Sequence, residues 1–233
     1  MMSFLRTIRM LFFQRSKSKF EQFIEILIGW AMAITYLWII IPTYNLFLLI
    51  ACAIPCIIFI LYLILSDGET MENLGFKFLK GWKKSFWIVL IFTIISIPLS
   101  LLIWSQYFPY RFTFYKDFYF WRLLAVYPVL AFIQQCFFLG LIYNKYERIC
   151  LPHKYLAILL SGATFSIFHF PNPALMIFCL AAGLAWAKAY SISRNLYIIT
   201  ISHVILGAFL LSALMVYYKI GPFAQIGRWS MRM

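Results

Sequence analysis

Residues 131–140, AFIQQCFFLG, place two adjacent glutamines, Gln134 and Gln135, in the middle of a long apolar run. Amide groups in hydrocarbon need hydrogen-bond partners in the protein or in trapped water, so a pair that faced lipid would be costly. The pair therefore predicts a membrane helix whose polar side chains face a protein interior. Each amide also differs from a carboxylate, which can act as a general base where glutamine cannot.

The composition of the whole chain supports a membrane location. Of its 233 residues, 64% are hydrophobic and only 7 are acidic, and apolar runs recur along nearly the whole length. The formal charge of +13 would suggest nucleic acid in a soluble protein, but here the basic residues separate the apolar runs. We therefore expect an all-α polytopic membrane protein in the lipid bilayer, with no nucleic-acid partner.

Seven apolar segments predict a bundle of seven transmembrane helices, at residues 24–41, 46–65, 86–104, 121–143, 155–170, 174–190 and 196–218. Six or eight spans also fit the hydropathy, because the fifth and sixth segments are short. We expect one transmembrane domain over residues 21–233, preceded by a basic amphipathic interfacial segment at residues 1–20. The five cysteines show no paired loop spacing, so we expect free, buried thiols.

The distribution of lysine and arginine predicts an orientation, because both concentrate on the cytoplasmic side of membrane proteins. With the N-terminus inside, fourteen of the 20 basic residues fall in cytoplasmic segments. We expect an integral protein of the plasma (inner) membrane with a cytoplasmic N-terminus. Residues 66–84 are too polar to span and should lie on the cytoplasmic surface, while Lys145 lies in a cytoplasmic loop and Lys188 and Arg194 mark the cytoplasmic boundary.

Two histidines are the informative ionisable groups in the predicted spans. His169 ends the fifth span in FSIFHF, and His203 lies in the first two turns of the seventh. Such groups usually face a bundle interior, and neutral imidazoles can bind a metal or orient water. Residue counting places His169 near the outer face and His203 nearer the inner face, which argues against a shared site unless the spans tilt or break.

Three short patches resemble the CPBP family of membrane-embedded proteases, which includes the type II CAAX prenyl endopeptidases and the Abi proteins. QQCFFLG at residues 134–140 resembles a motif of two glutamates, an arginine and a glycine. FSIFH at residues 165–169 matches a phenylalanine four residues before a histidine, and His203 resembles the histidine of a last motif that continues to an asparagine or aspartate. The patches define a CPBP-like core at about residues 121–218.

The resemblance implies an intramembrane endopeptidase that acts on a membrane-anchored or lipid-modified peptide. It implies a site at Gln134, Gln135, His169 and His203, with either a divalent metal such as zinc at the two histidines or no metal. Four departures fall on the chemistry: Gln134 and Gln135 replace the glutamates, Leu139 replaces the arginine, and Gly207 replaces the final asparagine or aspartate. Four coordinated changes fit natural divergence better than an engineered knockout.

The sequence leaves enzymatic activity open. An amide has no proton affinity near neutral pH, so general-base help of about 10²- to 10⁴-fold should be missing. The chain is then either a divergent peptidase or a non-catalytic pseudoprotease that binds membrane peptides or partner proteins. A transporter or channel is a weaker alternative, because no acidic residue lies deep in a predicted span.

Structural roles are open for the same residues. The glutamines could link helices by hydrogen bonds, and His169 could be a helix-end residue at the membrane interface. Cys136 fits a small buried hydrophobe, and would be a replacement nucleophile only beside a base. Gly162, Gly183 and Gly207 are expected to be positions of close packing between helices.

Overall fold

The computed structural model describes residues 17–35, 46–76, 81–107, 118–170 and 173–210, and all of its regular elements are helical. The helices are α2 (Lys19–Ile34), α3 (Leu46–Ser66), α4 (Trp82–Tyr107), α5 (Phe118–Gln135), the π-helix η4 (Cys136–Tyr143), α6 (Asn144–Cys150), α7 (Lys154–Ile167), α8 (Pro173–Ser193) and α9 (Leu196–Leu210). Each of the seven predicted spans thus contains a helix. The all-α class is confirmed.

Within the described residues, three helical segments are long and apolar enough to cross a membrane: Trp82–Ser100, Tyr127–Cys150 and Leu175–Ser193. Shorter apolar helices cover Ala51–Ser66, Lys154–Ile167 and Leu196–Ala208. These helices are those of an integral membrane protein. The count of seven spans stays a prediction.

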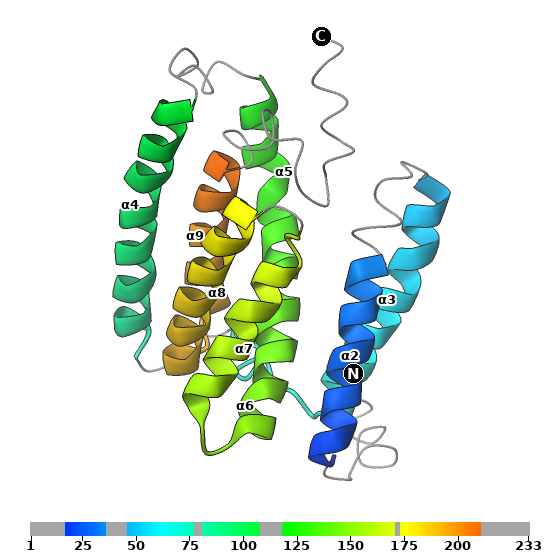
Figure 1. Ribbon diagram of the computed structural model, residues 1–233. Coiled ribbons are helices and arrows are strands. Elements are labelled where there is room, and N and C mark those ends of the chain that lie inside the picture. The colour runs from blue at the N-terminus through cyan, green and yellow to red at the C-terminus, as the bar shows by residue number, and fades with distance from the viewer. Residues whose placement is uncertain (1–16, 36–45, 77–80, 108–117, 171–172, 211–233) are drawn as a thin grey trace.

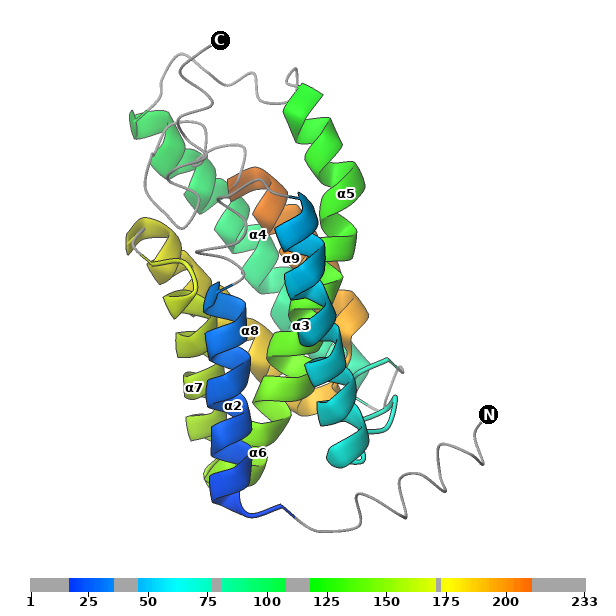
Figure 2. The ribbon, with the colours of Figure 1, turned by 90° about the vertical axis from the view of Figure 1, so that its right-hand side faces the viewer.

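Helices α4, α5, α7, α8 and α9 form one group, and α2 and α3 lie along one side of it (Figure 1). Figure 2, viewed from that side, shows α2 in front of α6 and α7, with α3 beside it. The buried Leu63 of α3 packs with Leu141 of η4, and the ring of Trp30 in α2 meets that of Phe168 edge-on at a centroid distance of 6.1 Å. Apolar contacts thus join the two parts.

Helices α7 and α8 approach closely at two glycines. A Cβ atom at Gly183 would lie 2.9 Å from the Cα atom of Gly162, and a Cβ atom at Gly162 would lie 2.8 Å from Cδ2 of Leu184. Neither position has room for a side chain, because backbone atoms lie within 2.9 Å of the Cβ position at Gly183 and within 3.1 Å of that at Gly162. The prediction of close packing at these two glycines is confirmed.

The helical run through α5, η4 and α6 continues to Cys150, seven residues beyond the predicted end of the fourth span at residue 143. The sequence predicted a cytoplasmic loop here because Lys145, Arg148 and Lys154 are basic. In the structure Lys145 is completely buried, and Arg148 pairs with Glu69. The loop assignment of Lys145 is therefore wrong, since these groups find partners inside the protein and the helix continues.

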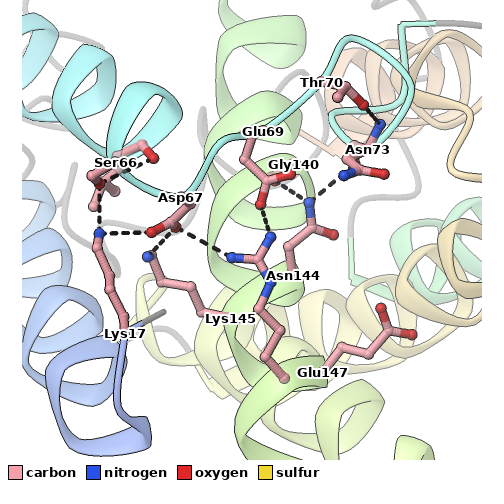
Figure 3. A network of polar contacts seen from close by, with 12 residues as sticks. Lys17, Ser66, Asp67, Glu69, Thr70, Asn73, Gly140, Asn144, Lys145 and Glu147 are labelled. Atoms are coloured by element: carbon pink, nitrogen blue, oxygen red, sulfur yellow. Dashed lines mark hydrogen bonds and ion pairs between the residues drawn. The ribbon is translucent and has the colours of Figure 1, made fainter. Parts of the chain in front are cut away.

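Lys145 belongs to a buried ring of alternating charges. Its Nζ atom lies 2.6 Å from Oε2 of Glu25. It also pairs with Asp67, as Figure 3 shows. The Nζ atom of Lys17 lies 2.5 Å from Oε1 of Glu25, 2.6 Å from Oδ1 of Asp67 and 2.5 Å from Oγ of Ser66. Buried charges require such pairing. The ring connects the start of α2, the end of α3 and α6.

The segment after α3 was expected on the cytoplasmic surface; residues 70–73 of it are exposed, and the backbone of residues 67–76 is docked against the late helices. The backbone carbonyl of Asn73 accepts hydrogen bonds from Nδ2 of Asn144 at 3.0 Å and from the hydroxyl of Tyr190 at 2.7 Å. The N–H group of Leu196 donates to the carbonyl of Gly75 at 3.0 Å. These bonds give two backbone carbonyls of the segment partners on the late helices.

The predictions of an interfacial N-terminal segment and of the orientation rest partly on residues outside the described ones. Most of the interfacial segment at residues 1–20 lies outside them, as do the C-terminal basic residues used for the orientation. All five cysteines are free, as predicted; Cys150 and Cys179 are buried, whereas Cys52, Cys56 and Cys136 are half-buried.

Candidate functional site around His203

The π-helix η4 begins at the residue after Gln135 and covers most of the QQCFFLG patch. π-helices are rare, and they occur frequently at functional sites. Eight residues in this wider geometry change the direction of the following side chains relative to an α-helix. Phe138, Leu139 and Gly140 of this segment are buried. The unusual backbone therefore lies where the sequence predicted the site.

His203 of α9 is held between two side chains of α5. Its Nδ1 atom lies 2.9 Å from Nε2 of Gln135, and its Nε2 atom lies 3.1 Å from the hydroxyl oxygen of Tyr127. Gln135 and His203 are only 1% and 5% exposed. Tyr127 and Gln135 are eight residues apart, which places both on a similar face of α5.

Both ring nitrogens of His203 are engaged in either tautomer. With the amide as placed, Gln135 donates to Nδ1, so Nε2 carries the proton and donates to Tyr127. Exchanging the amide oxygen and nitrogen reverses both donors: Nδ1–H donates to Gln135, and the Tyr127 hydroxyl donates to Nε2. A neutral imidazole is satisfied in both cases.

Aromatic rings enclose the imidazole of His203. Its centroid lies 4.8 Å from that of Trp186, 5.6 Å from that of Phe165 and 5.6 Å from that of Tyr127. The last two meet it edge-on, which is a preferred geometry for aromatic rings. The surroundings of His203 are therefore apolar apart from its two hydrogen-bond partners.

His169 also contacts the Phe165 ring. The Phe165 centroid is 5.1 Å from that of His169, and Nδ1–H of His169 donates to the Phe165 carbonyl at 2.8 Å. Both histidines thus contact the ring of Phe165, although residue counting places them at different depths.

The two adjacent glutamines have different surroundings. Gln135 bonds to His203, but Gln134 is half-buried and has no hydrogen bond within the described part of the chain. Cys136 is also half-buried. The structure therefore brings together Gln135 and His203 directly and His169 through Phe165, and does not include Gln134 in this network.

Tyr127 is a site residue that the sequence did not indicate. A Cβ atom at Gly207 would lie 2.3 Å from Cε1 and 2.6 Å from the hydroxyl oxygen of Tyr127. The phenol therefore fills the space of a side chain at position 207, where the resemblance leads one to expect asparagine or aspartate. Glycine at this position was the available signal, because the missing side chain leaves room for a neighbour.

Leu139, at the position of the expected arginine, is 3% exposed and belongs to the hydrophobic core. It lines a cavity of about 10 Å³ beside Gln135, Ser161, Phe165 and Trp186. That volume suits about one water molecule. The cavity is too small for a peptide.

The residues around the two histidines do not fit a catalytic zinc ion. Such sites use about three protein ligands, and the described residues contain no group of three or more His, Cys, Asp or Glu side chains with a suitable arrangement. Both nitrogens of His203 already have partners. Of the four ring nitrogens, only Nε2 of His169 has no hydrogen-bond partner among the described residues and could bind a metal. The two histidines therefore do not offer a pair of metal ligands in this arrangement.

The fold and this site define an integral membrane protein of helices with a small polar site buried among its last helices. Residues 116–209 match the family model of Rce1-like proteins, described as type II CAAX prenyl endopeptidase Rce1-like. The match confirms the resemblance of this segment to the CPBP family and supports an intramembrane peptidase-like protein. No curated protein and no solved structure matches the chain.

Proposed function

We propose that this protein binds a membrane-anchored or lipid-modified peptide and does not cleave it by general-base catalysis. The main support for this proposal is that His203 forms hydrogen bonds with the Gln135 amide and the Tyr127 hydroxyl. In the described part of the chain, no carboxylate forms a hydrogen bond with His203. The Gln135 amide cannot accept a proton from water, and the His203 lone pair is occupied.

The small cavity supports the same proposal. It has room for about one water molecule next to Gln135, and that water would meet an amide and a serine hydroxyl rather than a base. The ligand class rests on the family match, whose name refers to prenyl endopeptidases. A bound peptide would contact the bundle outside this cavity.

A liposome assay tests the proposal. The full chain is reconstituted with a fluorescent lipid-modified peptide, and cleavage and photo-crosslinking are both measured. The expected result is crosslinking without cleavage, in the parent and in the His169→Ala variant. Absence of crosslinking would overturn the binding role, and cleavage by the parent would overturn the non-catalytic role.

A divergent peptidase is the second candidate, and one observation favours it. Nε2 of His169 has no hydrogen-bond partner within the described residues, so this nitrogen could accept a proton from water. In that case the parent cleaves the peptide and His169→Ala abolishes cleavage. Cleavage that appears only in the double variant Gln134→Glu with Gln135→Glu would instead show that the scaffold is intact and the missing carboxylates explain inactivity.

A further inference from the structure

A second, larger pocket lies at the end of the bundle where three connections meet. Its volume is about 310 Å³, and its walls come from the segment after α3, from α6 and the turn that follows it, and from the start of α7 and the turn between α8 and α9. The lining residues are Asn73, Asn144, Glu147, Arg148, Leu151, Lys154 and Arg194. Small-ligand pockets begin at about this size.

The charge of the lining favours an anion. Three of its side chains are cationic and one is a carboxylate. Arg148 and Arg194 are anchored by acidic groups, Glu69 and Glu147 respectively, which fixes the two guanidinium groups at the pocket wall. Lys154 forms no ion pair within the described residues, so its charge is available to a ligand.

Arg194 carries its side chain at a backbone position that favours glycine. Its φ angle is 45°, in the left-handed region just after α8, where glycine is the usual residue. The guanidinium group donates to Oδ1 of Asn144 at 2.5 Å and to Oε2 of Glu147 at 2.5 Å. A guanidinium has five N–H donors, so these bonds leave donors for a further acceptor.

The pocket also has an apolar border. Leu151 lines it and is 52% exposed, and Tyr155, one residue after Lys154, is 77% exposed. Exposed tyrosine near the start of an apolar helix is typical of the membrane–water interface. Cationic walls beside exposed apolar groups match a molecule with an anionic head and a hydrocarbon tail.

We propose that this pocket binds the phosphate-bearing headgroup of an anionic lipid, with Lys154 and Arg194 as its principal contacts and Leu151 beside the acyl chain. The shared chemistry is a phosphate oxygen facing ammonium and guanidinium donors. Free phosphate offers the same oxygens without the tail, so the experiment must separate the two. This site does not depend on the proposed peptide-binding function.

Native mass spectrometry of the full chain released from nanodiscs tests the proposal. The nanodiscs contain equal amounts of phosphatidylglycerol and phosphatidylcholine, and the ratio of the two lipids retained by the protein is measured. The parent should retain phosphatidylglycerol preferentially. Lys154→Gln should lower that preference about fivefold, because one basic residue near an anionic lipid contributes roughly this factor.

Lys84→Gln is the matched control, since Lys84 is an exposed lysine outside the pocket, and it should leave the preference within about twofold. Arg194→Gln should reduce retention further, with thermal unfolding measured to confirm that this variant folds. Equal retention of the two lipids by the parent, or equal losses in Lys154→Gln and Lys84→Gln, would overturn the site. Full displacement of phosphatidylglycerol by millimolar inorganic phosphate would overturn the lipid assignment in favour of free phosphate.

Discussion

At the scale of single residues, Gly207 and Tyr127 form a complementary pair. The phenol lies where a side chain at position 207 would begin, and its hydroxyl reaches His203. Without the Tyr127 side chain, the glycine at position 207 would leave a void, and Nε2 of His203 would have no hydrogen-bond partner. Tyr127 removes both problems, which indicates that the site is a packed arrangement of its own.

Gly207→Ala should destabilise the protein by about 1 to 3 kcal/mol, because the added methyl group would overlap the Tyr127 ring. Thermal unfolding in detergent measures the effect. Gly29→Ala is the control, since its Cβ atom would meet Cζ at the end of the Phe137 side chain at 3.3 Å, a contact that a small shift of that ring relieves. If the two variants unfold alike, Tyr127 does not occupy the space beside Gly207.

Tyr127→Phe should also destabilise the protein, by about 1 to 3 kcal/mol, because it keeps the ring and leaves a buried nitrogen of His203 without a partner. Chemical denaturation of the full chain compares it with Tyr155→Phe, which removes a hydroxyl from a residue that is 77% exposed. A loss no larger than that of Tyr155→Phe would show that the Tyr127 hydroxyl contributes nothing to the site.

At the scale of elements, the helices that hydropathy can locate were predicted and their polar ends were not. Apolar length is a local property, so each predicted span contains a helix. The extension into α6 depends on Lys145, whose partners Glu25 and Asp67 lie 120 and 78 residues away in sequence. Similarly, no window around Tyr127 shows that His203 will face it. The motif positions of Gln135 and His203 were found by resemblance, and their contact needed the fold.

The link between α3 and α6 should be sensitive to acid. Burial alone would raise the pKa of Asp67, but the ammonium groups of Lys145 and Lys17 outweigh burial and lower this pKa below its ordinary value of 3.8. The folded protein therefore binds this proton less readily than the unfolded chain. The stabilisation is complete above about pH 3.8 and is lost as the pH falls through the lowered pKa.

Thermal unfolding between pH 2 and pH 6 checks this prediction, with the pH range set by the ordinary carboxyl pKa of about 4. The parent should lose stability below pH 4 more steeply than Asp67→Asn, which has no carboxylate to protonate there. Glu72→Gln, at an exposed residue of the same segment, should follow the parent. Parallel curves for the parent and Asp67→Asn would contradict the assignment.

Glu69 should contribute with the opposite sign. Burial raises its pKa above the ordinary value of 4.5, although Arg148 opposes this shift. The folded state therefore binds this proton more readily than the unfolded chain. Its contribution is most favourable below pH 4.5 and decreases as the pH rises through the raised pKa, so it does not mimic the acid loss expected from Asp67.

At the scale of the whole molecule, the family match and the grouping of the helices differ at α4, which lies outside the match but packs among the late helices. The match covers residues 116–209 and thus α5 to α9, whereas α2, α3 and α4 lie outside it. The buried ring of charges joins α2 and α3 to α6 (Figure 3). The N-terminal helices are therefore attached to the family segment by charges as well as by apolar contacts.

This attachment depends on Lys145. Lys145→Ala should destabilise the protein by about 3 to 5 kcal/mol, because it leaves the carboxylates of Glu25 and Asp67 buried with less compensation. The quadruple variant Lys17→Met, Lys145→Met, Glu25→Gln and Asp67→Asn should recover most of that loss, since an uncharged cluster needs no ion pairing. Lys84→Ala, at an exposed lysine of α4, serves as the control in the same denaturation experiment. If Lys145→Ala unfolds like Lys84→Ala, the apolar contacts of α2 and α3 alone hold the N-terminal helices in place.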